Sequence, residues 1–210
     1  SLDRATSIAD VALTAGESIS DLLNQLKEKV VAAKDTSLKT QSRELLDADF
    51  KALLRAISSA VENAAFDGGN ILNGSLTNGL KFLANADATS FITLSSRDLS
   101  LSGTILSLGL ADSLLTITGA TTALNKLDDS ITALNKALGD IGAQAKQISG
   151  NTTFVSKLND ALEAGIGNLV DADLAKESAR LQALQVQQQL GAQALSIANQ
   201  APQIILSLFQ

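Results

Sequence analysis

The residues in this sequence that most resemble a chemical site are three closely spaced carboxylates, Asp171, Asp173 and Glu177. Carboxylates can bind a cation, but a calcium-binding loop also needs a glycine and a regular spacing of ligands, which this stretch lacks. Asp residues are also favoured at the first position of a helix, where they accept hydrogen bonds from free backbone N–H groups. We therefore interpret Asp171 or Asp173 as the cap of a last helix.

The composition excludes most other chemistry. The chain of 210 residues contains no Cys, His, Trp, Tyr or Met. Without Cys there is no thiolate nucleophile or disulfide, and without His the commonest general base and zinc ligand are missing. The pair Gly165 and Gly167 is no phosphate loop, because neither a strand nor a lysine stands where that motif needs it. We expect no enzyme activity, no cofactor and no metal site.

The charge and hydropathy exclude two classes of partner. The net charge is −6 and the sequence pI is about 4.6, which argues against a general nucleic-acid-binding protein. No run of apolar residues is long enough to cross a membrane, so we expect no membrane insertion. The composition is that of a helical, elongated, assembly-prone protein and not of a compact enzyme.

The elements that organise the chain follow from one long apolar repeat. Apolar residues recur at alternating steps of three and four over about six heptads, which is the seam of a coiled coil. We expect a helix over 119–169, of which the seam from Leu124 to Leu169 would span roughly 65–70 Å at about 1.5 Å per residue. The helix must bury this stripe against equally long partners, from this chain or from other copies. The seam comprises Leu124, Leu127, Ile131, Leu134, Leu138, Ile141, Ala145, Ile148, Thr152, Val155, Leu158, Leu162, Ile166 and Leu169.

Two earlier helices can supply part of that partner surface. Residues 1–34 and 39–65 each carry an apolar stripe at helical spacing, and the short connection between them predicts antiparallel neighbours. Residues 70–118 are rich in Gly, Ser, Thr and Asn and read as a β and loop element. Within it, 80–83 and 91–95 look like the two strands of a hairpin, whereas 99–110 is ambiguous between a strand and a short helix.

The end of the chain carries more apolar surface than a small bundle can cover. We expect a break at 165–168, a last helix over about 173–200 that ends at Pro202, and an apolar tail. Apolar side chains go most of the way round this helix, which favours burial in an assembly over a monomeric helical bundle. The predicted self-assembly residues are Leu174, Leu181, Leu184, Leu190, Leu195, Ile197, Ile204, Leu206 and Leu208.

Several stretches resemble bacterial flagellins, of the short alphaproteobacterial type. The longest lie at the C-terminus, and the others match the end of the family's first core helix and its helix-to-hairpin segment. Together they cover nearly the whole chain apart from about residues 85–118. The stretches are 168–182, 187–203, 206–209, 7–10, 26–33, 64–68 and 71–74.

The resemblance implies a mainly α fold: a long antiparallel helical coiled-coil rod with a small β-hairpin element and a C-terminal helix. Residues 1–170 would form the rod domain, and residues 171–210 would form the C-terminal helix of the innermost filament tube. The N-terminal helix that completes this tube would be missing, as if Ser1 were a cut inside a longer chain. The large outer domains of some flagellins would also be absent.

The resemblance further implies a structural subunit that polymerises into the extracellular flagellar filament for motility, after secretion through the flagellar type III apparatus. Its partners would be copies of itself or sibling flagellins, an export chaperone at the C-terminus, and the hook-associated cap and junction proteins. The alternatives are a hook–filament junction protein or a flagellin-like surface binding protein.

A second surface also follows from the resemblance. In many flagellins the matching stretch is recognised by an animal innate receptor, and an arginine is central there. This sequence has Gln25 where we place that arginine, and Gln lacks the charged guanidinium fork, so we expect weak or absent recognition. The segment consists of Asn24, Gln25, Leu26, Lys27, Glu28, Lys29, Val30 and Val31.

Overall fold

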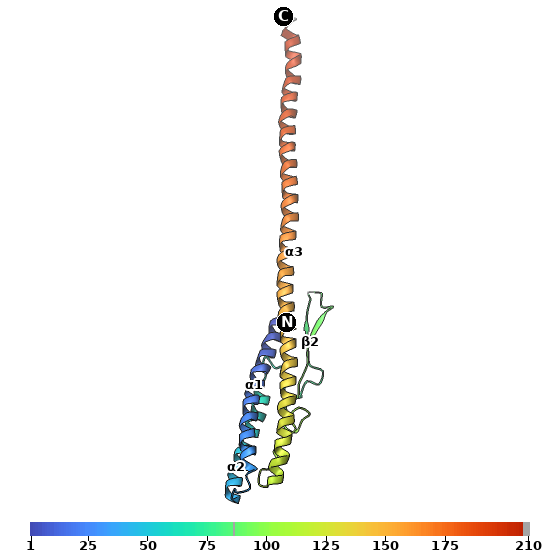
Figure 1. Ribbon diagram of the computed structural model, residues 1–210. Helices are drawn as coiled ribbons and strands as arrows, with labels where there is room; N and C mark the ends of the chain where they lie inside the picture. Colours follow the sequence, from blue (N-terminus) through green and yellow to red (C-terminus); the bar gives the residue numbers. More distant parts are fainter. Residues whose placement is uncertain (86, 208–210) are drawn as a thin grey trace. The chain divides into compact units, whose positions relative to one another are not determined.

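The computed structural model describes residues 1–85 and 87–207, apart from the side chains of residues 172 and 199–207. The chain divides into two compact units, Ser1–Val155 and Ser156–Gln210. The first unit contains helices α1 (Leu2–Ala33) and α2 (Thr40–Asn63), strands β1 (Leu80–Leu83) and β2 (Phe91–Leu94), and the first part of α3 (Ile117–Ser207) (Figure 1). The described chain is thus mainly helical with one small hairpin, as the sequence predicts.

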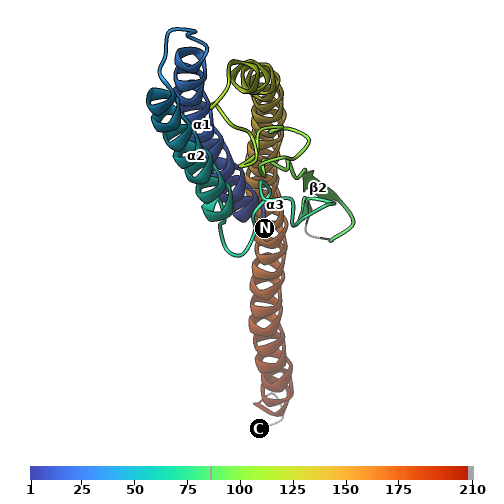
Figure 2. The same ribbon diagram turned by 90° about the horizontal axis from the view of Figure 1, so that it is seen from below.

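The core of the first unit lies between its three helices, which run side by side in Figures 1 and 2. On α3, Leu127, Leu134, Ile141 and Ile148 are all fully buried, at steps of seven residues. Such a step returns the side chain to nearly the same side of a helix, so these residues form one continuous stripe. Each contributes about 1.5–3 kcal/mol by leaving water. The first half of the predicted seam is therefore confirmed.

The connection between α1 and α2 is held by one buried arginine. Arg43 of α2 donates to the carbonyl oxygens of Ala33 and Asp35, which have no helical N–H partner at the end of α1. The carboxylate of Asp35 accepts from the backbone N–H of Ser37 at 2.8 Å and closes the turn. Helix α2 begins after Lys39 without a side-chain cap.

The two predicted strands form a hairpin. β1 pairs antiparallel with β2, with Leu80 opposite Leu94, and β2 ends one residue before the predicted limit. Gly79 enters β1 with φ +66, and a Cβ on it would lie 2.3 Å from the carbonyl oxygen of Leu94, so only glycine fits this position. Gln144 of α3 accepts from the backbone N–H of Ser95 at 2.8 Å and holds the hairpin to the helix.

Residues 99–110 form neither a regular strand nor a helix, apart from one isolated bridge between Leu101 and Leu106. Leu99, Leu106 and Leu108 are fully buried. The apolar residues that made this stretch ambiguous therefore fill the core from a loop.

The expected end of the third helix at 169 is wrong, and so is the separate last helix over 173–200. α3 continues through Gly165, Gly167 and Pro202 to Ser207, so Asp171 and Asp173 lie inside a helix and do not cap one. An exposed glycine costs a helix only about 1 kcal/mol, which good helix formers such as Ala, Leu and Gln on either side can offset. A proline removes one backbone donor, and the helix can resume beyond it.

Asp47 joins α2 to the segment that leads into α3. Its carboxylate accepts from the backbone N–H of Leu114 at 2.7 Å and pairs with Lys51 at 2.8 Å. Burial raises the pKa of Asp47, but hydrogen bonds from Lys51, Leu114 and Ser113 outweigh burial, so the pKa lies below its ordinary value of 3.8. The charged carboxylate therefore stabilises the folded unit.

We predict that Asp47→Asn lowers the free energy of unfolding by about 1–2 kcal/mol at neutral pH, because the amide cannot pair with Lys51. A lowered pKa gives stability that is present above the unfolded-state pKa and lost as the pH falls through the folded-state pKa. The difference from the unsubstituted protein should therefore shrink below about pH 4. Chemical denaturation across pH measures this.

Asp49→Asn is the matched control, because Asp49 makes an exposed ion pair with Lys29 and such pairs contribute little. An equal loss in both variants, or a loss at Asp47 that persists in acid, would contradict the role given to Asp47.

Candidate assembly surfaces

The second unit presents a large apolar surface. Every described side chain from 156 to 198 is exposed. The large apolar side chains among them are between 44% and 74% exposed. A folded monomer rarely leaves so much continuous apolar surface in water, so this helix has the character of an interaction surface. The residues are Leu158, Leu162, Ile166, Leu169, Val170, Leu174, Leu181, Leu184, Val186, Leu190, Leu195 and Ile197.

Six of the predicted self-assembly residues lie in this exposed helix, namely Leu174, Leu181, Leu184, Leu190, Leu195 and Ile197. They do not share one narrow face, because Leu190 and Ile197 lie on a different side from Leu181 and Leu184 at 3.6 residues per turn. Ile204 and Leu206 belong to α3, but their side chains are not described, and Leu208 lies outside the described residues.

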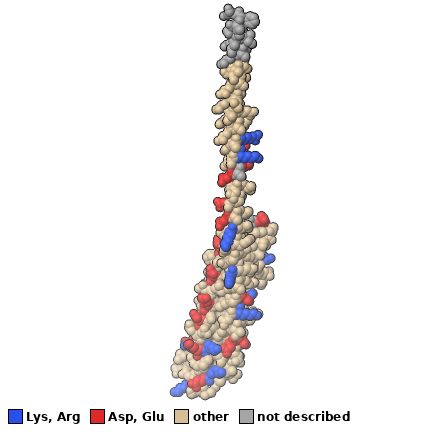
Figure 3. Space-filling view, turned by 45° about the horizontal axis from the view of Figure 1, so that its top comes forward, with Lys and Arg blue, Asp and Glu red and all other residues tan. Residues whose placement is uncertain are grey.

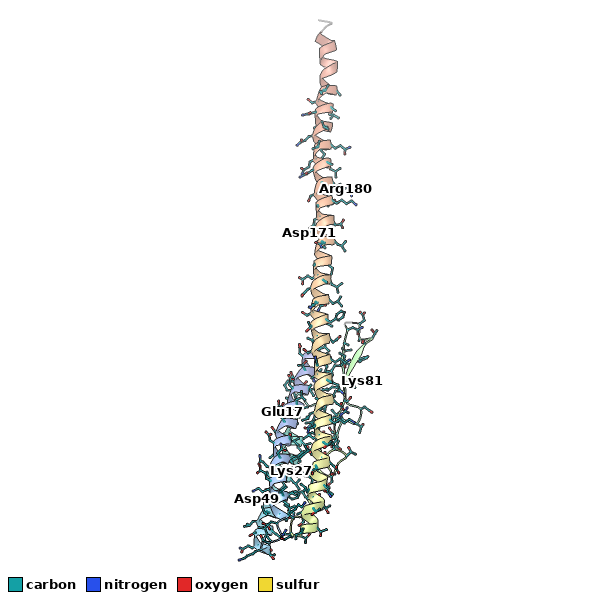
Figure 4. All side chains as sticks on the ribbon, in the orientation of Figure 1. Glu17, Lys27, Asp49, Lys81, Asp171 and Arg180 are labelled. Atoms are coloured by element: carbon teal, nitrogen blue, oxygen red, sulfur yellow. The ribbon has the colours of Figure 1, made fainter. Side chains whose placement is uncertain are left out.

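Charge is sparse on the same helix. Residues 181–198 contain no charged side chain, and Figure 3 shows this part of the chain in tan. Asp171 and Arg180, labelled in Figure 4, are among the few charged side chains of the second unit. The carboxylates Asp171, Asp173 and Glu177 are all exposed, and no cluster of metal-binding side chains occurs in the part of the chain that the structure describes.

The segment 24–31 forms part of the outer surface of α1. Leu26 and Val30 are fully buried in the core of the first unit. Asn24, Gln25, Lys27, Glu28 and Val31 are exposed. The two lysines are engaged: Lys27 pairs with Asp128 of α3 at 2.7 Å, and Lys29 pairs with Asp49 of α2 at 2.8 Å. The positive charge of this segment is therefore largely matched within the chain.

Comparison with known proteins identifies the family. Residues 2–77 match the family model of the bacterial flagellin N-terminal helical region, and residues 124–209 match that of the C-terminal helical region. Flagellin FljJ of Caulobacter vibrioides is 60% identical over 196 residues, which cover 93% of this chain and 71% of that protein. The chain belongs to the flagellin family.

Two further relatives agree with this assignment. Flagellin FljM of Caulobacter vibrioides is 48% identical over 210 residues, covering 100% of this chain and 76% of that flagellin. A flagellin of Brucella melitensis is 40% identical over 210 residues, covering 96% of this chain and 73% of that protein. Both organisms are alphaproteobacteria, so the predicted type of flagellin is confirmed.

The fold agrees as well. The crystal structure of Bacillus cereus flagellin superimposes with a TM-score of 0.62 at 21% sequence identity, over 71% of this chain and 85% of that chain. As a flagellin, the chain is a structural subunit that self-assembles into the extracellular flagellar filament, and it is not an enzyme. The described part of the chain contains no helix that is long and apolar enough to span a membrane.

Sequence reasoning missed part of the exposed apolar surface of this flagellin. Leu158, Leu162, Ile166 and Leu169 were assigned to the seam together with Leu127 and Leu134, which are buried. No signal in the pattern separates the two groups, because the heptad repeat continues unchanged from one to the other. The structure separates them by burial: Leu127 and Leu134 are fully buried, whereas the other four are between 44% and 74% exposed.

Proposed function

We propose that the exposed apolar helix of residues 156–198 is the part of this flagellin that becomes buried between subunits in the filament. Residues 171–210 would then belong to the innermost tube, and residues 1–170 to the surrounding rod domain. The observation that carries the proposal is the row of large apolar side chains at 44% to 74% exposure. Each contributes about 25 cal/mol for every Å² of apolar surface that it buries on assembly.

Assembly and ordering are coupled in this account. An isolated helix is marginal in water, because most of the stability of helices in proteins comes from tertiary packing. The described residues 156–198 have no such packing within the subunit. The segment therefore gains a fixed structure when a growing filament end covers it. Away from a filament end, the entropy cost of ordering the segment opposes premature polymerisation.

The other partners follow from the same surface. An export chaperone would cover the C-terminal helix before assembly, and the hook-associated cap and junction proteins would contact the subunits at the two ends of the filament. Export through the flagellar type III apparatus requires an unfolded chain, and a sequence without cysteine can form no disulfide that would oppose unfolding.

We predict that Leu181→Glu combined with Leu184→Glu reduces the rate of filament elongation at least tenfold, because two charges would have to enter an apolar contact. Seeds of short filament fragments, purified full-length subunit and electron microscopy measure the rate. Thermal unfolding of the first unit should not change, since both side chains are exposed and belong to the second unit.

The matched control carries Gln182→Glu and Gln189→Glu, which add the same charge on another side of the same helix. Elongation of the leucine variant at the rate of the unsubstituted subunit would rule out burial of Leu181 and Leu184. Equal inhibition by both variants would assign the effect to charge alone.

We also propose that the animal innate receptor for flagellin recognises this chain weakly. Gln25 is exposed at the position where recognised flagellins carry an arginine, and Lys27 and Lys29 are held by Asp128 and Asp49. The segment therefore lacks a free guanidinium or ammonium group that could pair with a carboxylate of the receptor.

We predict that Gln25→Arg increases the signal of a receptor reporter assay by at least tenfold. Gln41→Arg, an exposed position on α2, adds the same charge elsewhere and should leave the signal unchanged. A strong signal from the unsubstituted protein would disprove weak recognition, and an equal gain from both variants would show a general effect of charge.

A further inference from the structure

The outer face of α1 carries a line of carboxylates that have no cationic partner. Five carboxylates follow one another from Asp3 at steps of seven, seven, four and seven residues. They therefore project from nearly the same side of the helix. All five are exposed, and among the described residues none takes part in an ion pair. They are Asp3, Asp10, Glu17, Asp21 and Glu28.

This line works against the stability of the isolated helix. Glu17 and Asp21 are one turn apart, and like charges at that spacing destabilise a helix by a few tenths of a kcal/mol. Both lysines of α1, Lys27 and Lys29, reach carboxylates of other elements instead. Glu17 is labelled on α1 in Figure 4.

The outer face of α3 in the same unit carries two exposed lysines, together with the exposed Asp129 and with Asp140, whose charge is matched by Arg97 at 3.1 Å. Lys136 and Lys146 are exposed, and neither makes an ion pair among the described residues. Two glycines lie on the same face: a Cβ on Gly139 or Gly150 would meet no atom within 4 Å. Another helix can therefore approach the backbone closely while the two lysines reach around it.

The two faces cannot neutralise each other within one subunit. On α1, the buried Ile19 and Leu26 lie on the side opposite the carboxylates, and on α3 the buried Leu134 and Ile141 lie on the side opposite the lysines. Both faces thus point away from the shared core. The spacing nevertheless agrees, because Glu17 and Glu28 are separated by roughly 16 Å along their helix and Lys136 and Lys146 by roughly 15 Å.

We propose that in the filament the carboxylate line of α1 docks against the lysine face of α3 in an adjacent copy of this flagellin. The contact joins two different surfaces, and such a heterologous contact repeats without closing, as a helical filament requires. The proposal rests on the filament function of the chain and adds a contact between the first units of neighbouring subunits. Because the charges are exposed, the contact sets the orientation and rate of addition more than the final stability.

The test is a charge exchange in the full-length subunit, measured as the elongation of each variant from filament seeds made of that same variant. One variant carries Glu17→Lys and Glu28→Lys, and a second carries Lys136→Glu and Lys146→Glu. A third combines all four substitutions. The matched control carries Glu44→Lys and Glu62→Lys, which reverse two exposed carboxylates of α2.

We expect self-elongation of the first and second variants, each grown from its own seeds, to be at least tenfold slower than that of the control. The quadruple variant should recover most of the elongation rate of the unsubstituted subunit, because its two surfaces are again complementary. The rate of the unsubstituted subunit should fall with added salt. Helicity and thermal unfolding of every variant establish that the subunit is folded.

Two outcomes would overturn the proposal. In one, the first and second variants both elongate at the rate of the unsubstituted subunit. In the other, the quadruple variant is folded but elongates as slowly as either of them. These outcomes can be told apart from failure of the proposed function. If only the charge contact is wrong, the variant with Leu181→Glu and Leu184→Glu still elongates slowly. If only the apolar contact is wrong, the unsubstituted subunit and the control still elongate, so the charge exchange can still be measured.

Discussion

The structure depends on one constraint: the apolar seam of α3 is longer than the part of it that is buried within one subunit. Where α1 and α2 lie beside α3, Leu127, Leu134, Ile141 and Ile148 are fully buried. Beyond Val155 the same kind of residue continues along the helix with every described side chain exposed. In the proposed function, other subunits cover this part of the helix, and burial of its apolar surface drives polymerisation.

The first unit supplies the opposite property, a stable frame. Arg43 closes the connection between α1 and α2. Asp47 ties α2 to the segment before α3, and Gln144 holds the hairpin. These buried or half-buried hydrogen bonds fix the three helices in one arrangement, which gives their outer faces a defined spacing. Apolar attraction alone is not directional, so the charged outer faces of α1 and α3 provide the orientation with which one copy meets the next.

Much of the fold could be predicted from sequence because local patterns specify it. Periodicity located the three helices of the first unit, and the glycine after Asn78 marked the entry to β1. The buried loop that contains Leu99 and Leu106 could not be predicted, because its apolar residues have no period. The continuity of α3 was missed because Gly165, Gly167 and Pro202 are weak helix formers whose cost depends on their neighbours. The exposure of Leu158 could not be predicted, because a heptad repeat indicates only that one face of a helix is suited to packing. It does not indicate whether a partner helix of the same subunit covers that face.

The most direct test of this account is hydrogen exchange of the free subunit compared with that of the assembled filament. The account predicts rapid exchange over residues 156–198 in the free subunit and strong protection of the same residues in the filament. The buried amides of α1 around Leu23 and Leu26 should exchange slowly in both states and serve as the internal reference. Slow exchange over 156–198 in the free subunit, or rapid exchange in the filament, would contradict the claim that assembly completes this helix.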